Sequence, residues 1–244
     1  MSVEPLLRAG AKAGPVLGLD TGAPLLSVGI VTGGRIRASA TRLGRSHGAA
    51  LPEAVDEVLE AAGLKVRELA AVAVAIGPGS FTGLRIGLSY AKGLVLGARL
   101  AIVGVPTLDS MALCAVAAGK VPAGALICPV LDARKGEVYT SLYRPVGDAL
   151  EKMTEDLVVS LVNFARQITG EVVFVGNAKA EEGRLLRARL GMRATIVGDI
   201  ELRMKGSFVA TLGAARVARN DLDDAVTLEP RYVRASEGLS NPPP

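Results

Sequence analysis

Apolar residues along the chain fall into short runs that are separated by glycine-rich turns. Runs at 15–19 and 25–31 flank a turn at 20–24, a pattern that predicts a β-hairpin. Residues 35–41 can add a third strand. A later run at 70–76 is bounded by glycine and is uniformly apolar, as expected of a strand that is covered on both faces.

Two helices are predicted around the buried strand. In the segment 48–62, Leu51, Val55 and Leu59 recur at helical spacing on one face. The segment from Leu84 to Leu96 differs, because it is apolar on nearly every side. Such a helix is buried on two sides. One side can be its own sheet, and the other is either a neighbouring helix of the same chain or another chain.

Small residues recur along that apolar helix. Gly83, Gly87 and Ala91 are spaced by four and fall on one side. A glycine in a helix interior costs roughly 1 kcal/mol relative to alanine, so packing must compensate for its presence. Small side chains at this spacing would let another helix approach closely.

The pattern restarts in the second half of the chain. Another hairpin is predicted there, with its turn at 132–136, and helices and strands alternate after it. Two similar α/β units in tandem, with a cleft between them, are the simplest architecture for this order. The remaining predicted elements are strands at 100–105, 126–131, 137–143 and 172–175 and helices at 108–118, 155–167, 180–190 and 208–218.

These units divide the chain into four parts. Residues 15–118 form the first lobe and residues 119–235 the second, whose last helix and strand can return to the first lobe. Residues 1–14 are expected to be a flexible leader. The tail at 236–244, which ends in three prolines, is expected to be disordered.

Composition narrows the classes of protein. The 244 residues include 28 basic and 24 acidic ones, a net charge of +4 with no block of like charge, so a dedicated nucleic-acid arm is not expected. The chain offers few aromatic side chains that could stack on bases, with four Tyr, four Phe and no Trp. The N-terminus does not read as a secretion signal, and no stretch approaches the roughly 18 apolar residues that cross a bilayer. We expect a cytoplasmic protein without a membrane segment.

Cysteine and histidine are scarce. Cys114 and Cys128 lie too far apart for a CxxC motif, and two cysteines cannot complete a structural zinc site. They are expected to be buried and reduced. His47 is the only imidazole, which excludes a site with two histidines within one chain but leaves a Ser-His-Asp triad open.

Two loops could carry chemistry. Asp20-Thr21-Gly22 places an acid and a hydroxyl beside a tight turn, which could hold a phosphate and a hydrated metal ion. The loop from Gly77 to Gly83 follows a buried strand and opens a helix, so backbone NH groups and the helix dipole converge there and could bind an anion. Taken alone, the tripeptide is weak evidence for a site, and the glycines of the second loop are better explained by a tight strand-to-helix turn.

The two loops together resemble those of a known family. Asp20-Thr21-Gly22 and the long glycine motif that begins at Gly77 are found in the TsaB family, the small actin-like subunit of the bacterial machinery that makes threonylcarbamoyladenosine in tRNA. Three further segments match, namely 104–108, 132–139 and 231–234. The resemblance spans about residues 16–235, and the region 144–206 carries little of it.

The resemblance implies a fold of the actin/Hsp70/sugar-kinase type with two ribonuclease H-like lobes. The family is similar to TsaD, which transfers a threonylcarbamoyl group to the adenosine beside the anticodon of tRNAs that read codons beginning with A. TsaD binds metal through a His-x-x-x-His motif, and the aligned positions here are Thr107 and Met111. Neither residue is a credible replacement for histidine. The resemblance therefore implies a non-catalytic paralogue with no metal and no cofactor.

The implied role is that of a scaffold subunit that binds and activates TsaD. The complex would also recruit the P-loop ATPase TsaE, and tRNA would be bound only through the complex. The isolated chain could form a homodimer. The two loops would then be vestiges of phosphate-binding loops, with residues Asp20, Thr21, Gly22, Gly77, Pro78, Gly79 and Ser80.

The family resemblance also implies where the subunits meet. Helices of the first lobe dock on TsaD or on a second TsaB, and here those helices are about 48–62 and 82–97. Gly87 and Ala91 would permit close approach, while Arg85 and Lys92 would lie at the rim. The residues expected at this boundary are Leu84, Arg85, Gly87, Leu88, Ala91 and Lys92.

Two alternative functions stay open. An actin-fold ATPase or kinase would use Asp20 and the Gly77 loop, with Asp132 of the second hairpin as the second acid. A peptidase would need a metal site or an activated nucleophile, for which His47 alone is a weak basis.

Overall fold

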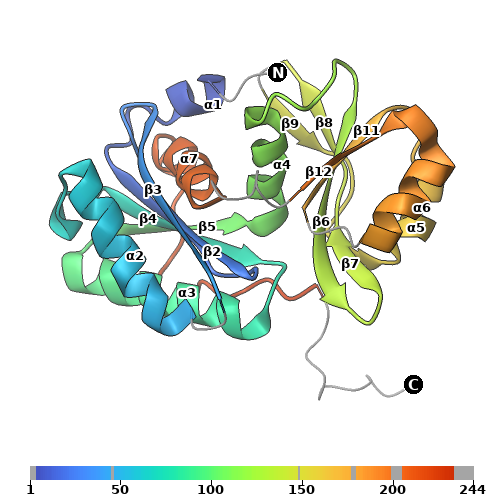
Figure 1. Ribbon diagram of the computed structural model, residues 1–244. Coiled ribbons are helices and arrows are strands. Elements are labelled where there is room, and N and C mark those ends of the chain that lie inside the picture. The colour runs from blue at the N-terminus through green and yellow to red at the C-terminus, as the bar shows by residue number, and fades with distance from the viewer. Residues whose placement is uncertain (1–3, 45–46, 148, 177–179, 199–204, 234–244) are drawn as a thin grey trace.

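A computed structural model describes residues 4–44, 47–147, 149–176, 180–198 and 205–233. Two β-sheets stand side by side with helices between them and on both outer faces (Figure 1). The fold is the two-lobed α/β arrangement that the family resemblance implied. The described helices include none with the length and hydropathy needed to cross a bilayer.

The first sheet has five strands in the order β3-β2-β1-β4-β5. The hairpin predicted at the start of the chain forms its antiparallel half, and β4 and β5 add to β1 in parallel. Every residue of β4 is buried, as its uniformly apolar run predicted. The strands are β1 Val16–Asp20, β2 Leu25–Thr32, β3 Arg35–Leu43, β4 Ala71–Gly77 and β5 Ala101–Pro106.

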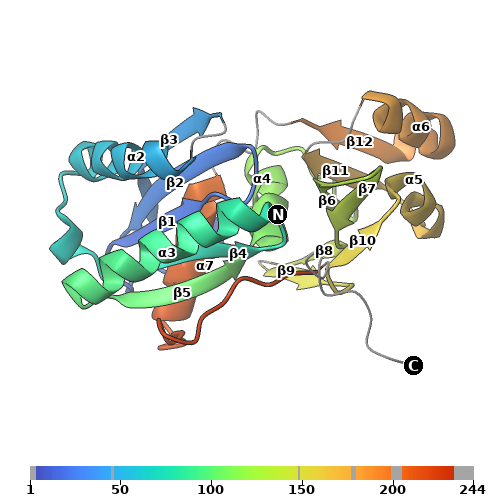
Figure 2. The same cartoon turned by 90° about the horizontal axis from the view of Figure 1, so that it is seen from below.

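Helices cover both faces of this sheet. On the outer face, α2 (His47–Ala62) packs on β2 and β3, and α3 (Phe81–Ala98) packs on β4 (Figure 2). On the inner face lies α7 (Lys205–Val217), although it follows the second lobe in sequence. Gly18 and Gly29 allow this arrangement, because a Cβ at either position would overlap the backbone of α7.

The second sheet repeats the strand order of the first. Its main path is β10-β7-β6-β11-β12, so a hairpin, a third strand and two parallel strands recur in the same places. Two extra strands, β8 and β9, extend beside β6. The strands are β6 Leu126–Arg134, β7 Glu137–Thr140, β8 Tyr143–Val146, β9 Ala149–Lys152, β10 Leu157–Val159, β11 Val172–Gly176 and β12 Ala194–Val197.

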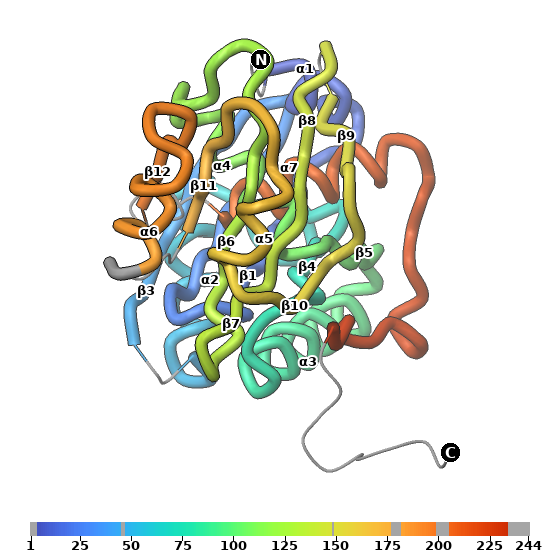
Figure 3. The backbone as a smooth tube through the Cα atoms, turned by 90° about the vertical axis from the view of Figure 1, so that its right-hand side faces the viewer, coloured from blue at the N-terminus to red at the C-terminus, as the bar shows by residue number. Residues whose placement is uncertain are grey.

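The remaining helices complete the layers. Helix α4 (Thr107–Ala117) packs on α7 between the two sheets, and α5 (Leu161–Phe164) and α6 (Ala180–Leu190) cover the outer face of the second sheet (Figures 1 and 3). Three short 3-10 turns follow helices or loops, namely η1 (Val66–Glu68), η2 (Ala165–Gln167) and η3 (Gly191–Arg193).

Several sequence predictions differ from the structure. The segment 155–167 is not one helix, because Leu157, Val158 and Val159 pair with β7 as strand β10 and the helix begins only at Leu161. Branched side chains favour a strand where a neighbouring strand is available to pair. Strands β8, β9 and β12 were not predicted at all.

The expected flexible leader is also partly ordered. Glu4–Ala9 form helix α1, which packs on α7. Gly10 contacts Ala214 closely, and Ala13 is buried. The apolar side chains in this segment thus find a surface on α7 that the local sequence does not reveal. The tail expected to be disordered, 236–244, lies outside the described residues.

Candidate functional site

Asp20 ends β1 in the interior of the protein. One carboxylate oxygen, Oδ1, accepts a hydrogen bond from the Gly22 NH at 3.0 Å. The other, Oδ2, forms an ion pair with Nζ of Lys205 at 3.0 Å, and both side chains are fully buried. Lys205 begins α7, so this ion pair joins the first strand of the lobe to a helix 185 positions later in the chain.

Lys205 was missed by the sequence analysis. A lysine at the start of an apolar helix reads as a solvated helix end, since lysine is almost never fully buried unless it is paired. The available signal was the neighbouring Gly206-Ser207, small residues that let the start of α7 reach β2 closely. A long-range partner such as Asp20 cannot be found from spacing alone.

The two candidate phosphate loops lie directly against each other. The NH of Ser80 donates to the carbonyl oxygen of Gly22 at 2.7 Å, and Thr21 Oγ1 donates to the Gly83 carbonyl at 2.7 Å. A Cβ at Gly79 would lie 2.5 Å from the Gly22 carbonyl oxygen. The loops that sequence analysis singled out are therefore brought together, and they are packed against each other.

This contact uses the groups that would bind a phosphate. At the start of α3, the NH of Ser80 is bound to Gly22, and the NH of Gly83 is bound to Ser80 Oγ at 3.2 Å. Helix N-termini bind anions through such NH groups. Gly77 lies under the C-terminal segment, since a Cβ there would meet the carbonyl oxygen of Arg231. Pro78 follows it in a cis peptide bond.

The small-residue side of α3 faces the interior of its own chain. Leu84, Leu88 and Ala91 are buried, and a Cβ at Gly87 would overlap Thr21 Oγ1. This corrects the expectation that these four residues form a subunit boundary. The glycine is required by the close approach of the Asp20-Thr21-Gly22 loop within the first lobe.

The two basic residues expected at the rim bind the C-terminal segment of the same chain, and their place at a subunit boundary stays a prediction. Arg85 Nε donates to Tyr232 Oη at 3.1 Å, and Lys92 Nζ donates to the Val226 carbonyl oxygen at 3.2 Å. Residues 221–233 thus run as a strap along one side of α3. The Arg85 guanidinium also lies 3.9 Å from the centroid of the Phe81 ring.

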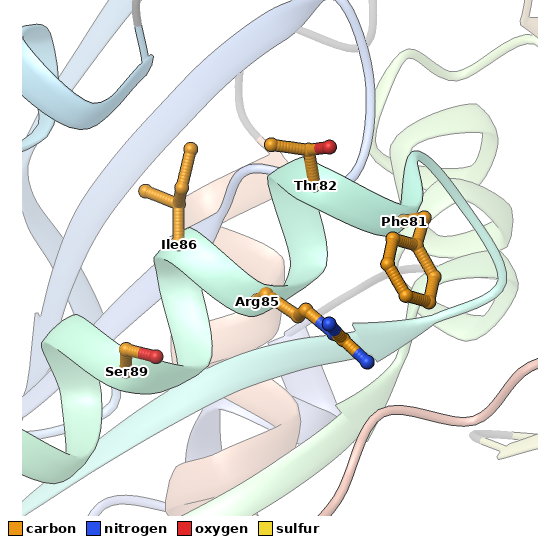
Figure 4. Close-up of a pocket in the computed structure, with 5 residues that line it drawn as sticks. All are labelled: Phe81, Thr82, Arg85, Ile86 and Ser89. Carbon is orange, nitrogen blue, oxygen red and sulfur yellow. The ribbon is translucent and has the colours of Figure 1, made fainter.

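The side of α3 that faces away from the core of the first lobe is exposed. Phe81 is 41% exposed and Leu96 is 67% exposed, and the Phe81 ring stacks on Tyr232 with centroids 5.0 Å apart. Figure 4 shows the side chains around a shallow hollow of about 380 Å³ on the first turns of this helix. The hollow is lined by Phe81, Thr82, Arg85, Ile86 and Ser89.

Further along α3, part of the exposed surface lacks side chains. Positions 93 and 97 are exposed glycines, and a Cβ at either would meet no atom within 4 Å. A helix from another chain could therefore approach this surface closely. We call Phe81, Thr82, Arg85, Ser89, Gly93 and Leu96 the open face of α3.

Acidic residues hold the strap in place. Asp223 Oδ2 accepts from the Gly104 NH at 2.7 Å, and Arg216 donates to both Asp221 and Asp223. Hydrogen bonding to Arg216 lowers the pKa of Asp221, and backbone NH groups of Thr227 and Val226 lower the pKa of Asp224. Hydrogen bonds to Asp221 and Asp223 in turn raise the pKa of Arg216.

The other candidate catalytic residues are scattered. His47 Nε2 lies 3.0 Å from the Ala23 carbonyl oxygen, and Asp132 is an exposed residue of β6 whose Oδ1 accepts from the Arg134 NH. Thr107 and Met111 are fully buried in α4. Within the described part of the chain, no three metal-binding side chains come together. Both cysteines are buried and unpaired by disulfide, as predicted, and burial raises the pKa of Cys128 to about 12.

Comparison with known proteins identifies the family to which the chain belongs. Residues 40–225 match the family model of TsaD, tRNA N6-adenosine threonylcarbamoyltransferase. A tRNA threonylcarbamoyladenosine biosynthesis protein TsaB of Bacillus subtilis is 30% identical over 91% of this chain and 95% of its own length. The protein of that name from Escherichia coli is 33% identical over 66% of this chain and 70% of its own.

A solved structure agrees with the fold. YeaZ from Pseudomonas aeruginosa superposes with a TM-score of 0.73 at 22% identity, covering 90% of this chain and 99% of that one. A match over 90% of this chain includes both lobes and supports the fold described above. On these grounds the chain belongs to the TsaB family of tRNA threonylcarbamoyladenosine biosynthesis proteins.

Proposed function

We propose that this chain is a non-catalytic subunit that binds TsaD and supports transfer of a threonylcarbamoyl group to the adenosine beside the anticodon of tRNAs reading codons that begin with A. The observation that carries the proposal is the state of the two loops. Asp20 is neutralised by the chain's own Lys205, and the second loop is packed on Gly22.

The internal ammonium argues against the kinase-like alternative. An actin-type ATPase needs the acid of its first loop to act on a hydrated cation near the phosphates. Here the carboxylate is fully buried, one oxygen is taken by Lys205 and the other by the Gly22 NH. Breaking a buried ion pair to bind a metal would leave a buried unpaired charge, which is costly. The peptidase alternative has no support from His47, whose ring nitrogen lies against a backbone carbonyl.

The open face of α3 is our proposed docking surface for TsaD. It combines exposed Phe81 and Leu96 with small residues that permit close helix packing, and α2 lies beside it on the same outer layer (Figure 2). When TsaD is missing, a second copy of this chain can use the same surface. TsaE joins the assembled complex, and tRNA is bound through that complex. The modification of tRNA takes place in the cytoplasm.

Reconstitution tests the role. Purified TsaD and TsaE are incubated with tRNA and a threonylcarbamoyl donor, with and without this chain, and modified adenosine is counted. We expect modification only when the chain is present. The role is refuted by full modification without it. Modification by this chain alone would restore the enzyme alternative.

A further inference from the structure

A groove opens on the outer face of the second lobe, between α5 with η2 on one side and α6 with η3 on the other. Figures 1 and 3 show the two helices that border it, α5 and α6. Its volume is about 610 Å³, within the range of roughly 300–1,000 Å³ typical of pockets that take whole ligands. Apolar residues including Val162, Ile168 and Leu185 form part of its wall. No catalytic or docking residue named so far lies in it.

Three arginines line this groove. Arg166 comes from η2, Arg189 from the last turn of α6 and Arg193 from η3. All three are exposed, and none makes an ion pair or a side-chain hydrogen bond within the described part of the chain. Of the described residues that line the groove, none is acidic. The groove therefore presents three uncompensated positive charges beside an apolar wall.

We propose that this groove binds the sugar-phosphate backbone of RNA. The guanidinium group offers a planar fork of donors that matches phosphate oxygens, and arginine rather than lysine supplies all three charges. No aromatic side chain is found among the described lining residues, so the site is built for backbone contacts rather than for stacking on bases. Such contacts give affinity and orientation without reading sequence.

The identity of the RNA follows from the family. Its members are named for the biosynthesis of a modified nucleoside in tRNA, and tRNA is a folded polyanion. An acidic segment of a protein partner could offer similar charges, but the family relation favours tRNA as the occupant. This step rests on the proposed function, in which the chain works as part of a complex that holds tRNA.

The position of the groove allows the chain to bind tRNA and TsaD at the same time. The outer layer that carries α5 and α6 and the outer layer that carries α2 and α3 lie at opposite ends of the molecule (Figures 1 and 2). A partner on the open face of α3 therefore leaves the groove accessible. We infer that the second lobe supplies an auxiliary contact to tRNA while the first lobe holds TsaD.

The test measures tRNA binding by fluorescence anisotropy at several salt concentrations. The complex of this chain with TsaD is prepared with the triple substitution Arg166→Gln, Arg189→Gln and Arg193→Gln. We expect roughly 5- to 100-fold weaker binding at low salt, from three exposed charge pairs. The salt dependence should also fall, by roughly 1 in slope for each arginine that contacts a phosphate.

A matched control removes the same charge elsewhere. Arg35, Arg37 and Arg67 are exposed in the first lobe and have no recorded partner within the described residues, so their triple change to Gln gives the same net charge. The proposal requires the groove variant to lose clearly more affinity and slope than this control. Equal losses in both would overturn it.

A pull-down with TsaD separates this inference from the proposed function. If the unchanged chain does not bind TsaD, the proposed function fails, and the groove is then tested by titrating tRNA into the isolated chain. If the groove variant binds tRNA normally within the complex but no longer retains TsaE, the groove serves a protein and the RNA proposal is refuted. Arg189→Lys, which keeps the charge but loses the fork, should retain the salt slope while weakening binding.

Discussion

At the residue scale, two glycines of α3 have opposite surroundings. Gly87 faces Thr21 with no room for a Cβ, whereas Gly93 faces open space on the exposed side. The same glycine chemistry therefore serves internal packing at one position and leaves a bare helix surface at the other. This difference makes the pair a matched test within one helix.

Gly87→Leu should destabilise the isolated chain. Its side chain would displace Thr21 and break the hydrogen bond from Thr21 Oγ1 to the Gly83 carbonyl oxygen. Overpacking of this kind costs about 1–3 kcal/mol, which lowers Tm by roughly 2–10 °C for a chain of this size. Thermal unfolding followed by circular dichroism measures the change. A variant with unaltered Tm would contradict the internal position of Gly87.

Lys205 and Asp20 should behave as one unit. Lys205→Met alone leaves a buried carboxylate unpaired and is expected to cost about 3–5 kcal/mol. In the double variant Asp20→Asn/Lys205→Met both charges are gone, so much of that stability should return. Urea unfolding of both single variants and the double variant gives the coupling energy. Additive losses would mean that the two side chains do not interact.

At the scale of elements, helix α3 has one buried face and one exposed face. Its inner face carries Leu84, Leu88 and Ala91 into the core of the first lobe, and its outer face is exposed except where Phe81 and Arg85 contact Tyr232. The strap of residues 221–233 fixes one edge through Arg85 and Lys92. A change on either face therefore has a separable effect on stability or on binding.

Gly93→Leu should leave the fold intact and impair assembly. Leucine favours a helix over glycine by about 0.8 kcal/mol, so Tm should stay the same or rise. A bulky side chain on the open face would hold a docking helix away. Size-exclusion chromatography with TsaD should show loss of the complex. Normal binding by this folded variant would exclude the open face as the docking surface.

The strap should loosen in acid. The pKa values of Asp221 and Asp224 are lowered in the folded protein, so their contribution is present above the unfolded value of about 3.9 and is lost as pH falls through the folded values. Hydrogen exchange of the Val226 and Thr227 NH groups should quicken below about pH 4, relative to the core strand β4. Equal protection at pH 3 and pH 6 would contradict this role for the carboxylates.

At the scale of the whole molecule, the two lobes share a strand order but differ in their functional side chains. The first lobe holds the Asp20–Lys205 ion pair, and the second holds the arginine-lined groove. The helices between the sheets tie them together through the contact of α4 with α7, and α7 crosses back to the first lobe. Because α7 also supplies Lys205 to Asp20, closure of the first loop depends on the return of the chain from the second lobe.

ATP should therefore have little effect on the isolated chain. A ligand that binds only the folded state raises its stability by an amount that grows with concentration above Kd. Since the Ser80 and Gly83 NH groups are bound within the chain, we expect no shift of Tm with millimolar ATP and magnesium. A concentration-dependent rise that Asp20→Asn abolishes would indicate an open nucleotide site.

The sequence alone determined the fold class, the two loops and the family. Strand and helix signals in the first lobe are strong because β4 is uniformly apolar and α2 is plainly amphipathic. Motifs at 20–22 and 77–83 lie at turns, where local chemistry decides the backbone. In the second lobe, 155–167 was misassigned, because pairing of Leu157–Val159 with β7 overrides local preference.

Only the tertiary structure decided which side of each element faces inward. A helix that is apolar on nearly every side gives no sign of its buried face, so the small residues at 83, 87 and 91 could not be told apart from a docking stripe. Lys205 and Asp20, and the three arginines of the groove, meet only after strands and helices far apart in sequence are packed. Contacts of that range depend on the packing of whole layers, which no local pattern encodes.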